Sequence, residues 1–489
     1  MKYIVPFFTI ALLCSTGCRT GHSQTNPPAT SPAIPAPTNK VENAQAEHDA
    51  IGNATTNNFR THTMHPDAQW FGDAGLGLFI HWGIASVKGI NISWSMRDGL
   101  NGHPAQIKPN DYFAMAKDFN PQNYDPDKWL KAAKDSGFTY AVLTTRHHEG
   151  FALWPSAYGD FSTKNYMGGR DLVGGFIEAC RRNGLKVGLY YSPPDWYFDR
   201  DYMNFSMRKG QPPLGPDLQP RTTTHTPEET AAHTQAYAAL VSGQLEELLT
   251  RYGKIDLLWF DGKIPGTNGE GVMPIERIRQ LQPGIVLDGR FHGAGDFQTY
   301  ERTLKTDKVA IGWAEYCSTW TAFWPYVKGA PYRAPGYIIG QYVRCRSLHI
   351  NYLPDLGPMA DGQFEDEAYK QLATLRDWTT ANGESVKGTS PLPAGESASV
   401  PATARGQVRY LFAVPKFKND GADDHTYPED QLPAEDLALT LNTTMGNPAD
   451  VKLLGDGSSL EFTANNGVVT VQLPKSKRTP LVDVVKIEF

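Results

Sequence analysis

Residues 125–150, DPDKWLKAAKDSGFTYAVLTTRHHEG, contain the unit that decides the fold class. An amphipathic helix is predicted over 125–136 and a strand over 140–145, and the polar residues His147, His148 and Glu149 follow that strand. From about residue 65 to 385 the same order recurs, with short apolar runs between amphipathic helices. Strand, helix and strand over such lengths predict parallel pairing with right-handed crossovers.

The predicted elements alternate along this part of the chain. The strands are Leu76–His81, Tyr140–Thr145, Lys186–Ser192, Ile255–Phe260, Ile285–Leu287, Val309–Trp313 and Leu348–Leu353. The helices include Asp125–Ser136, Asp171–Asn183, Pro227–Tyr252, Pro274–Leu281 and Gln363–Thr380. A closed barrel and an open doubly wound sheet both fit this order. No G-x-G-x-x-G follows the first strand, so the dinucleotide-binding signature is missing there.

Polar side chains gather where the predicted strands end. His81 follows LGLFI, and His147 and His148 follow YAVLTTR. Asp261 follows IDLLWF in the same way. In a (β/α)8 barrel, catalytic groups come from the C-terminal ends of several strands. The pattern therefore favours a (β/α)8-like barrel as the catalytic domain, over residues 61–385.

The pattern changes from about residue 386 onward. The stretches VRYLFAV, LALTLN, VKLLG, VVTVQL and VDVVKIEF read as short strands separated by Gly, Asn, Asp and Pro. They predict a small C-terminal β-sandwich over residues 386–489. Such a domain either packs against the barrel or binds glycan, and packing is the default expectation.

The first 18 residues, MKYIVPFFTIALLCSTGC, are typical of an export signal. The apolar stretch is too short to span a bilayer, and small residues precede Cys18, as in a bacterial lipoprotein signal whose cysteine is lipidated. Ser15 stands where such signals usually have Leu, so ordinary signal-peptide cleavage is the alternative. We expect an exported protein, in the periplasm or outer membrane as a lipoprotein, or secreted. Membrane contact is expected only through this N-terminal lipid anchor.

Residues 19–60 are rich in Pro, Ala, Thr, Asn and Ser and poor in large apolar residues, which predicts a flexible linker. The formal net charge of −6 implies no basic face, which argues against nucleic acid as a partner. Outside the leader, Cys180, Cys317 and Cys345 lack the spacing of a zinc site, and we expect buried free thiols.

Several of the strand-end residues could carry chemistry. Asp261, in Leu-Leu-Trp-Phe-Asp-Gly, is either a desolvated, aimed carboxylate or a cap of the following helix. The histidines 81, 147 and 148 could hold sugar hydroxyls, since neutral imidazole offers one donor and one acceptor. A metal site built from the three histidines and burial in the core are the alternatives.

Two further carboxylates come later in the chain. Glu301 ends Gly-Asp-Phe-Gln-Thr-Tyr-Glu, a little after Arg290, and Glu315 lies in Trp-Ala-Glu-Tyr. Two carboxylates flanking a sugar bond are the minimum equipment for retaining glycoside hydrolysis. A neighbouring Arg would lower the pKa of one of them and keep it ionised.

Taken together, these blocks resemble glycoside hydrolase family 29, the α-L-fucosidases, over about residues 67–385. The matching pieces are GLGLFIHWGIASV, FNPQNYDPDKWLKAAKDSGFTYAVLTTRHHEGFALWPS, GLKVGLYYSPPDW, IDLLWFDG, GDFQTYE and, more loosely, HINYLPDLGPMADG. The resemblance implies the barrel and Asp261 as catalytic nucleophile. It also implies a substrate-binding set: hydroxyl contacts from His81, His147 and His148, Tyr191 beside the nucleophile, Trp94 and Trp259 in the pocket, Arg290 paired with the carboxylates, and Trp324 near the fucose methyl group.

The sequence departs from the family at two places. Asn91-Ile92-Ser93-Trp94 keeps the tryptophan, but Ser93 replaces a carboxylate that contacts sugar hydroxyls. The motif Gly-Asn-Leu-Leu-Asn-x-Gly-Pro is replaced by INYLPDLGP, residues 350–358. Both changes leave open a related substrate such as an α-L-galactoside, because an apolar pocket rejects an added hydroxyl only modestly.

The sequence thus predicts a retaining, exo-acting α-L-fucosidase acting on a fucosylated oligosaccharide or glycoconjugate, with no metal and no cofactor. Glu301 is the favoured acid/base, because GDFQTYE matches the motif that carries this residue in several family members, and Glu315 is the alternative. The rival interpretation from another class is a catalytically silent glycan-binding lipoprotein.

Overall fold

The computed structural model describes residues 44–51, 61–264, 273–290, 295–304, 306–418 and 430–489. The predicted signal segment, with Cys18, and most of the predicted linker lie outside these residues.

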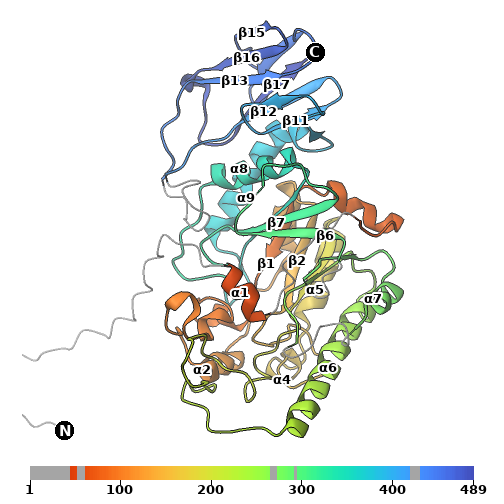
Figure 1. Cartoon of the computed structure of the whole chain (residues 1–489), viewed down its shortest axis with the longest axis vertical. Coiled ribbons are helices and arrows are strands. Elements are labelled where there is room, and N and C mark those ends of the chain that lie inside the picture. The colour runs from red at the N-terminus through yellow and green to blue at the C-terminus, as the bar shows by residue number, and fades with distance from the viewer. Residues whose placement is uncertain (1–43, 52–60, 265–272, 291–294, 305, 419–429) are drawn as a thin grey trace, which may run out of the picture. The chain divides into compact units, whose positions relative to one another are not determined.

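The central element is an eight-stranded sheet in the order β5-β4-β3-β2-β1-β8-β7-β6, and its neighbouring strands pair in parallel. Figure 1 labels β1, β2, β6 and β7 of this sheet. A single parallel bridge between Asp288 and Phe297 joins the two outer strands, so the sheet is a nearly closed barrel. This confirms the predicted (β/α)8-like fold. The strands are β1 Gly77–Ile80, β2 Tyr140–Arg146, β3 Lys186–Tyr191, β4 Leu257–Phe260, β5 Val286–Leu287, β6 Phe297–Glu301, β7 Trp313–Thr319 and β8 Asn351–Asp355.

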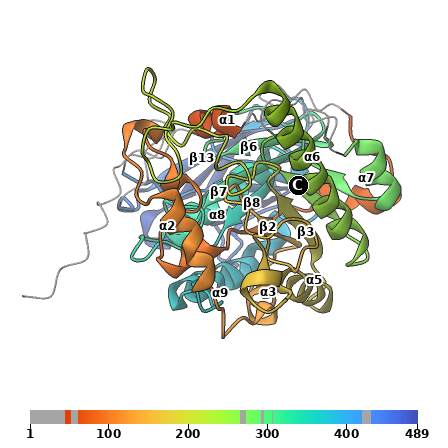
Figure 2. The ribbon, with the colours of Figure 1, turned by 90° about the horizontal axis from the view of Figure 1, so that it is seen from below.

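Helices surround this sheet, and Figure 2 shows α3, α5 and α6 outside strands β2 and β3. The helix α3 illustrates why they form where they do: the Asp125 side chain accepts a hydrogen bond from the Lys128 N–H, and Pro126 occupies the first turn. Its apolar face buries Trp129 and Leu130. The described helices are α1 Ala44–Ile51, α2 Pro109–Ala114, α3 Pro126–Asp135, α4 Thr163–Tyr166, α5 Leu172–Arg182, α6 Pro227–Thr250, α7 Ile275–Leu281, α8 Pro335–Ser347 and α9 Asp366–Asn382.

The barrel interior is filled largely by aromatic side chains. Phe79, Tyr140, Tyr190 and Trp259 belong to one buried cluster inside the strands. Because successive strand residues point to opposite faces, Tyr191 leaves this cluster and packs in the larger core outside the barrel. This alternation decides which tyrosine reaches the site.

The predicted elements differ from the structure mainly between residues 290 and 350. A strand was expected at Val309–Trp313, but β7 begins at Trp313, and Val309 and Ile311 are 49% and 71% exposed. The strand β6 and the helix α8 were not anticipated. The prediction of a strand before Trp313 was wrong, because the apolar residues there lie in a surface loop.

The C-terminal residues form two antiparallel sheets, of orders β10-β13-β16-β15 and β14-β17-β12-β11-β9. These confirm the predicted sandwich, and their facing sides share a core of aliphatic residues. Tyr410 and Val482 instead join the core around the barrel helices, and the Trp378 indole on α9 donates to the Val482 carbonyl at 2.7 Å. The strands are β9 Ser390–Pro391, β10 Ser397–Ala398, β11 Ala402–Arg405, β12 Val408–Ala413, β13 Leu437–Asn442, β14 Asp450–Leu453, β15 Phe462–Asn465, β16 Val468–Leu473 and β17 Asp483–Glu488.

Cys180, Cys317 and Cys345 are buried free thiols, as predicted. Within the part of the chain that the structure describes, no helix has both the length and the apolar character needed to cross a membrane.

Candidate active site

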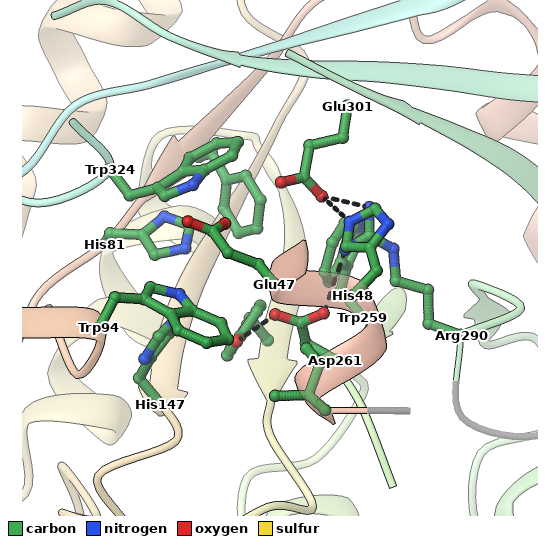
Figure 3. Close-up of a pocket in the computed structure, with 13 residues that line it drawn as sticks. Glu47, His48, His81, Trp94, His147, Trp259, Asp261, Arg290, Glu301 and Trp324 are labelled. Carbon is green, nitrogen blue, oxygen red and sulfur yellow. Dashed lines mark hydrogen bonds and ion pairs between the residues drawn. The ribbon is translucent and has the colours of Figure 1, made fainter. Parts of the chain in front are cut away.

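A pocket lies at the C-terminal ends of the barrel strands, and most of the residues singled out from the sequence line it (Figure 3). Strand ends β1, β2, β3, β4 and β6 contribute to it, together with loops and the helix α1. The lining residues are Glu47, His48, Ile51, Phe79, His81, Trp94, His147, Tyr190, Trp259, Asp261, Arg290, Glu301 and Trp324.

Asp261 follows β4 directly and is 9% exposed. Its Oδ1 accepts a hydrogen bond from Arg290 Nη1 at 3.0 Å, and its Oδ2 accepts one from the Tyr190 hydroxyl at 2.8 Å. The next residue, Gly262, has a φ of +87°, and a Cβ there would come within 2.7 Å of the Ile51 carbonyl oxygen. The sharp turn after β4 therefore needs glycine, and it aims the carboxylate into the pocket.

Glu301 ends β6 on the other side of the pocket. Its Oε2 accepts from Arg290 Nη2 at 2.6 Å and lies 2.8 Å from His48 Nε2. Burial alone would raise the pKa of Glu301, but the charges of His48, Arg290 and Arg302 outweigh it and hold the pKa well below its ordinary value. Glu301 is therefore ionised in this arrangement.

Arg290 thus joins the two candidate catalytic carboxylates through one guanidinium group. It is buried, and its guanidinium lies 4.5 Å from the centre of the Trp259 ring. Burial would lower the pKa of Arg290, but Glu301 and Asp261 raise it above its ordinary value, so the group stays charged. A planar guanidinium with paired donors fixes both carboxylates at once.

Glu315, the alternative acid/base, lies on β7 inside the barrel and is fully buried. Its oxygens accept hydrogen bonds from the Tyr140 hydroxyl at 2.5 Å and from the Trp259 indole at 2.9 Å. Burial raises its pKa to about 7, although those two hydrogen bonds and Arg290 partly oppose the shift. Glu315 does not line the pocket. It lies behind Trp259, which does, and is bonded to its indole N–H.

The three histidines gather at one side of the pocket. The ring centres of His147 and His148 are 4.0 Å apart, and those of His81 and His147 are 5.7 Å apart. Burial lowers the pKa of His81 and of His148 well below the ordinary value, so both rings are neutral. His148 lies behind the lining residues, with its Nε2 3.6 Å from Asp261 Oδ2.

Ligand atoms of His147, His148 and Asp261 lie within 4.8 Å of one another, close enough to hold a metal ion. The charges nearby do not favour one. The Asp261 carboxylate is already paired with Arg290 and bonded by Tyr190. A cation would have to compete with that guanidinium at the same carboxylate. The donor set fits sugar hydroxyls better.

Comparison with known proteins identifies the family of the chain. The family model described as alpha-L-fucosidase matches residues 41–384. The chain belongs to the alpha-L-fucosidase family. This is glycoside hydrolase family 29, and the chain is a glycoside hydrolase of that family.

The relatives cover most of the fold. The tissue alpha-L-fucosidase of Bos taurus is 26% identical over 378 residues, 71% of this chain and 75% of that protein. An alpha-L-fucosidase of Branchiostoma floridae is 25% identical over 450 residues, 86% of this chain and 91% of that protein. Among solved structures, alpha-L-fucosidase isoenzyme 1 from Paenibacillus thiaminolyticus matches with a TM-score of 0.68 and 28% identity, covering 86% of this chain and 98% of that one.

One residue expected from the family motif is placed differently. Tyr191, predicted beside the nucleophile, points away from the pocket, and its hydroxyl donates to Gln244 at 3.0 Å. Its neighbour Tyr190 lines the pocket and bonds Asp261. The doublet Tyr-Tyr fits the motif at either position, and only strand alternation separates them. Tyr190 pairs in register with Trp259, which faces the same interior.

Sequence reasoning missed the helix α1. Residues 44–51 fall inside the predicted flexible linker, yet they form a helix whose Glu47, His48 and Ile51 line the pocket. Glu47 is buried and lies 3.8 Å from Arg302. The helix has only eight residues, which is too short for a periodic pattern to stand out from the linker composition around it.

Ser93, which replaces a family carboxylate, does not line the pocket. It is fully buried behind His147, with its Oγ 2.7 Å from His147 Nδ1. A carboxylate is nonetheless present nearby, because Ser93 Oγ also donates to Glu149.

Proposed function

We propose that this chain is a retaining, exo-acting α-L-fucosidase with Asp261 as nucleophile and Glu301 as acid/base. The observation that carries the proposal is the Arg290 guanidinium, which holds both carboxylates at one pocket, at 3.0 and 2.6 Å. Two carboxylates that share one guanidinium are close neighbours. A retaining glycosidase needs such closeness, with the two groups about 5–5.5 Å apart.

In the first half of the reaction, Asp261 attacks the anomeric carbon and Glu301 protonates the departing glycosidic oxygen. In the second half, Glu301 takes a proton from water, which attacks the glycosyl-enzyme ester and releases the sugar with its anomeric configuration retained. Arg290 and Tyr190 hold the Asp261 carboxylate in place through their hydrogen bonds before the attack.

The helix α1 must give way for this reaction. An acid/base has to be within about 2.6–3.2 Å of the glycosidic oxygen. In the structure His48 Nε2 occupies such a position, 2.8 Å from Glu301 Oε2, and Figure 3 shows Glu47 beside it among the pocket residues. Withdrawal of His48 makes room for the glycan. It also removes a charge that holds the pKa of Glu301 low, so that Glu301 can carry the proton it must donate.

The substrate is proposed to be a terminal α-L-fucosyl unit of an oligosaccharide or glycoconjugate. The side of the pocket formed by Phe79 and Trp324 is apolar, with their ring centres 6.1 Å apart, and it suits the C6 methyl group. An α-L-galactoside carries a hydroxyl at C6, and a wall of this kind rejects it only modestly, by about a hundredfold or less.

Hydrolysis of aryl glycosides tests this proposal. Release of nitrophenol from an aryl α-L-fucoside, faster than from the matching α-L-galactoside, is expected. The first sugar released should be the α-anomer, observable by proton NMR before mutarotation. Binding of L-fucose without hydrolysis of any aryl glycoside would favour the silent glycan-binding protein, and release of the β-anomer would exclude retention.

We also propose that the protein is exported and lipidated at Cys18. The support is the apolar leader and the small residues before that cysteine. Full-length protein should partition with membranes, and Cys18→Ala should block processing or release the protein. Recovery of mature wild-type protein only in the soluble fraction would contradict lipidation and leave export standing.

A further inference from the structure

Behind the pocket, each of the three histidines is held through its Nδ1 atom by a buried polar side chain. The partners are Ser93 for His147 at 2.7 Å, Ser192 for His148 at 2.6 Å, and Asp355 for His81 at 2.7 Å. From these partners we infer that all three histidines carry their proton on Nδ1 and keep Nε2 as an acceptor, and that His81 and His147 present this acceptor to the sugar. The pocket then recognises sugar hydroxyls that donate hydrogen. The inference rests on the proposed function only for the identity of the sugar.

The tautomer of His147 follows from the hydrogen atoms available at Ser93. A serine hydroxyl has one hydrogen to donate and two lone pairs to accept. Ser93 Oγ donates its hydrogen to Glu149 Oε2 and accepts the Glu149 backbone N–H at 3.0 Å. It has no second hydrogen for His147, so it must accept from His147 Nδ1–H. Glu149 therefore fixes the tautomer of His147 through Ser93.

The tautomer of His148 follows in the same way from Ser192. Ser192 Oγ donates to the Pro194 carbonyl oxygen at 3.1 Å, and a carbonyl only accepts. Ser192 must therefore accept from His148 Nδ1–H. The opposite nitrogen, His148 Nε2, is buried 3.6 Å from Asp261 Oδ2 and has no hydrogen-bond partner among the residues that the structure describes. Without a proton, this nitrogen can only accept a hydrogen bond.

For His81 the partner is a carboxyl group. Asp355 Oδ1 already accepts the His81 backbone N–H at 3.1 Å. We therefore assign this oxygen as an acceptor, with any carboxyl proton on Oδ2. The His81 ring must then donate from Nδ1 to the same oxygen at 2.7 Å. Its Nε2 is left as an acceptor, on a ring that lines the pocket. Ser93, Glu149, Ser192 and Asp355 are thus positioning residues that set the polarity of the sugar site.

Replacing single hydroxyls of L-fucose by fluorine or by hydrogen tests whether those hydroxyls donate to the histidines. Fluorine is close in size to hydroxyl and cannot donate. Replacement of a histidine-bound hydroxyl by fluorine should therefore weaken binding as much as its removal, about tenfold or more. The measurement is the inhibition or dissociation constant of L-fucose and of its 2-, 3- and 4-deoxy and deoxyfluoro analogues. Fluoro analogues that bind as tightly as L-fucose, while the deoxy analogues bind weakly, would overturn the inference.

Histidine ¹⁵N NMR of the full chain reports the tautomer of each ring and does not depend on catalytic activity. The wild type should show Nδ1–H signals for all three rings, assigned through single substitutions. In Glu149→Gln the new amide can donate to Ser93, which frees the serine hydrogen to point at His147 Nδ1. The proton of His147 should then move to Nε2, with a raised KM and little change in Tm.

The matched control is Glu247→Gln, because Glu247 is also buried but accepts from Trp154 Nε1 and the Ala157 N–H, away from the pocket. It should leave the tautomers and KM as in the wild type. Nε2–H signals in the wild type, or unchanged His147 signals in Glu149→Gln, would refute the inference even in an active fucosidase. Failure to hydrolyse fucosides would instead refute the proposed function and leave the tautomer result standing.

Discussion

Tyr190→Phe removes one hydroxyl from the pocket and leaves the ring in place. That hydroxyl donates to Asp261 Oδ2 at 2.8 Å inside the barrel. Burial and the Asp261 charge raise the pKa of Tyr190 well above its ordinary value, so the group is a proton donor at every working pH. The substitution therefore removes a hydrogen bond to Asp261, the proposed nucleophile, and adds no new charge.

The expected magnitude follows from the type of bond. A hydrogen bond to a charged group contributes about 1.5–3 kcal/mol. At 1.36 kcal/mol per tenfold, Tyr190→Phe should lower kcat/KM by about 10- to 150-fold. The loss should fall mainly on kcat, since the hydroxyl orients the attacking carboxylate.

The adjacent residue offers a matched control. The Tyr191 hydroxyl donates to Gln244 Oε1 at 3.0 Å, and that oxygen also accepts from Arg146 at 2.7 Å. Tyr191→Phe should therefore cost about 1 kcal/mol of stability and leave kcat/KM within about twofold. The assay is steady-state hydrolysis of an aryl α-L-fucoside, with Tm measured on both variants. Equal losses of activity, or a larger loss for Tyr191→Phe, would refute the assignment of Tyr190.

Other variants test the remaining groups. Glu301→Ala should hydrolyse an activated aryl fucoside slowly and regain turnover with azide, giving an α-fucosyl azide; the same rescue in Glu315→Ala alone would reverse the acid/base assignment. His48→Ala should lower KM by about 2- to 12-fold, the effect of one lost hydrogen bond of 0.5–1.5 kcal/mol within the protein, whereas Ala50→Ser on the exposed side of the same helix should not; a raised KM in His48→Ala would show that this histidine binds substrate. Glu315 has a folded pKa of about 7 against about 4.3 unfolded, so its contribution to stability is complete below pH 4.3 and is lost as the pH rises to 7. Glu315→Gln should therefore gain roughly 3–4 kcal/mol in free energy of unfolding relative to wild type between pH 4 and 7.5, and parallel pH profiles of the two proteins would contradict the raised pKa.

The barrel could be predicted from sequence because its signals are local. The runs before His81, His147 and Asp261 are apolar strands that end in polar residues, and a parallel barrel brings such ends to one face. The strand before Glu301 was missed because four of its five residues are only half-buried and carry a weak pattern. Its place is fixed by pairing with β7, which is a tertiary contact.

The site was harder to predict than the barrel. Motif comparison identified most of the pocket residues but named Tyr191 in place of Tyr190. Two adjacent tyrosines point to opposite faces of the strand, and the sequence does not show which of them faces the barrel interior. The sequence also could not show that Ser93 and Glu149, which are 56 positions apart, form a buried hydrogen bond. Nor could it show that residues 44–51, within the predicted linker, form a helix that lines the pocket. Both depend on long-range packing that no local pattern encodes.

The central claim, that Asp261 is the nucleophile of a retaining reaction, is tested most directly by trapping the glycosyl-enzyme. The wild-type enzyme should react with a 2-fluoro-fucosyl reagent at one equivalent, and peptide mass spectrometry should place the fucosyl ester on Asp261. Asp261→Gly should take up no label and lose about 10³-fold or more in kcat. Label on Glu301 or Glu315, or an active Asp261→Gly enzyme, would contradict the account.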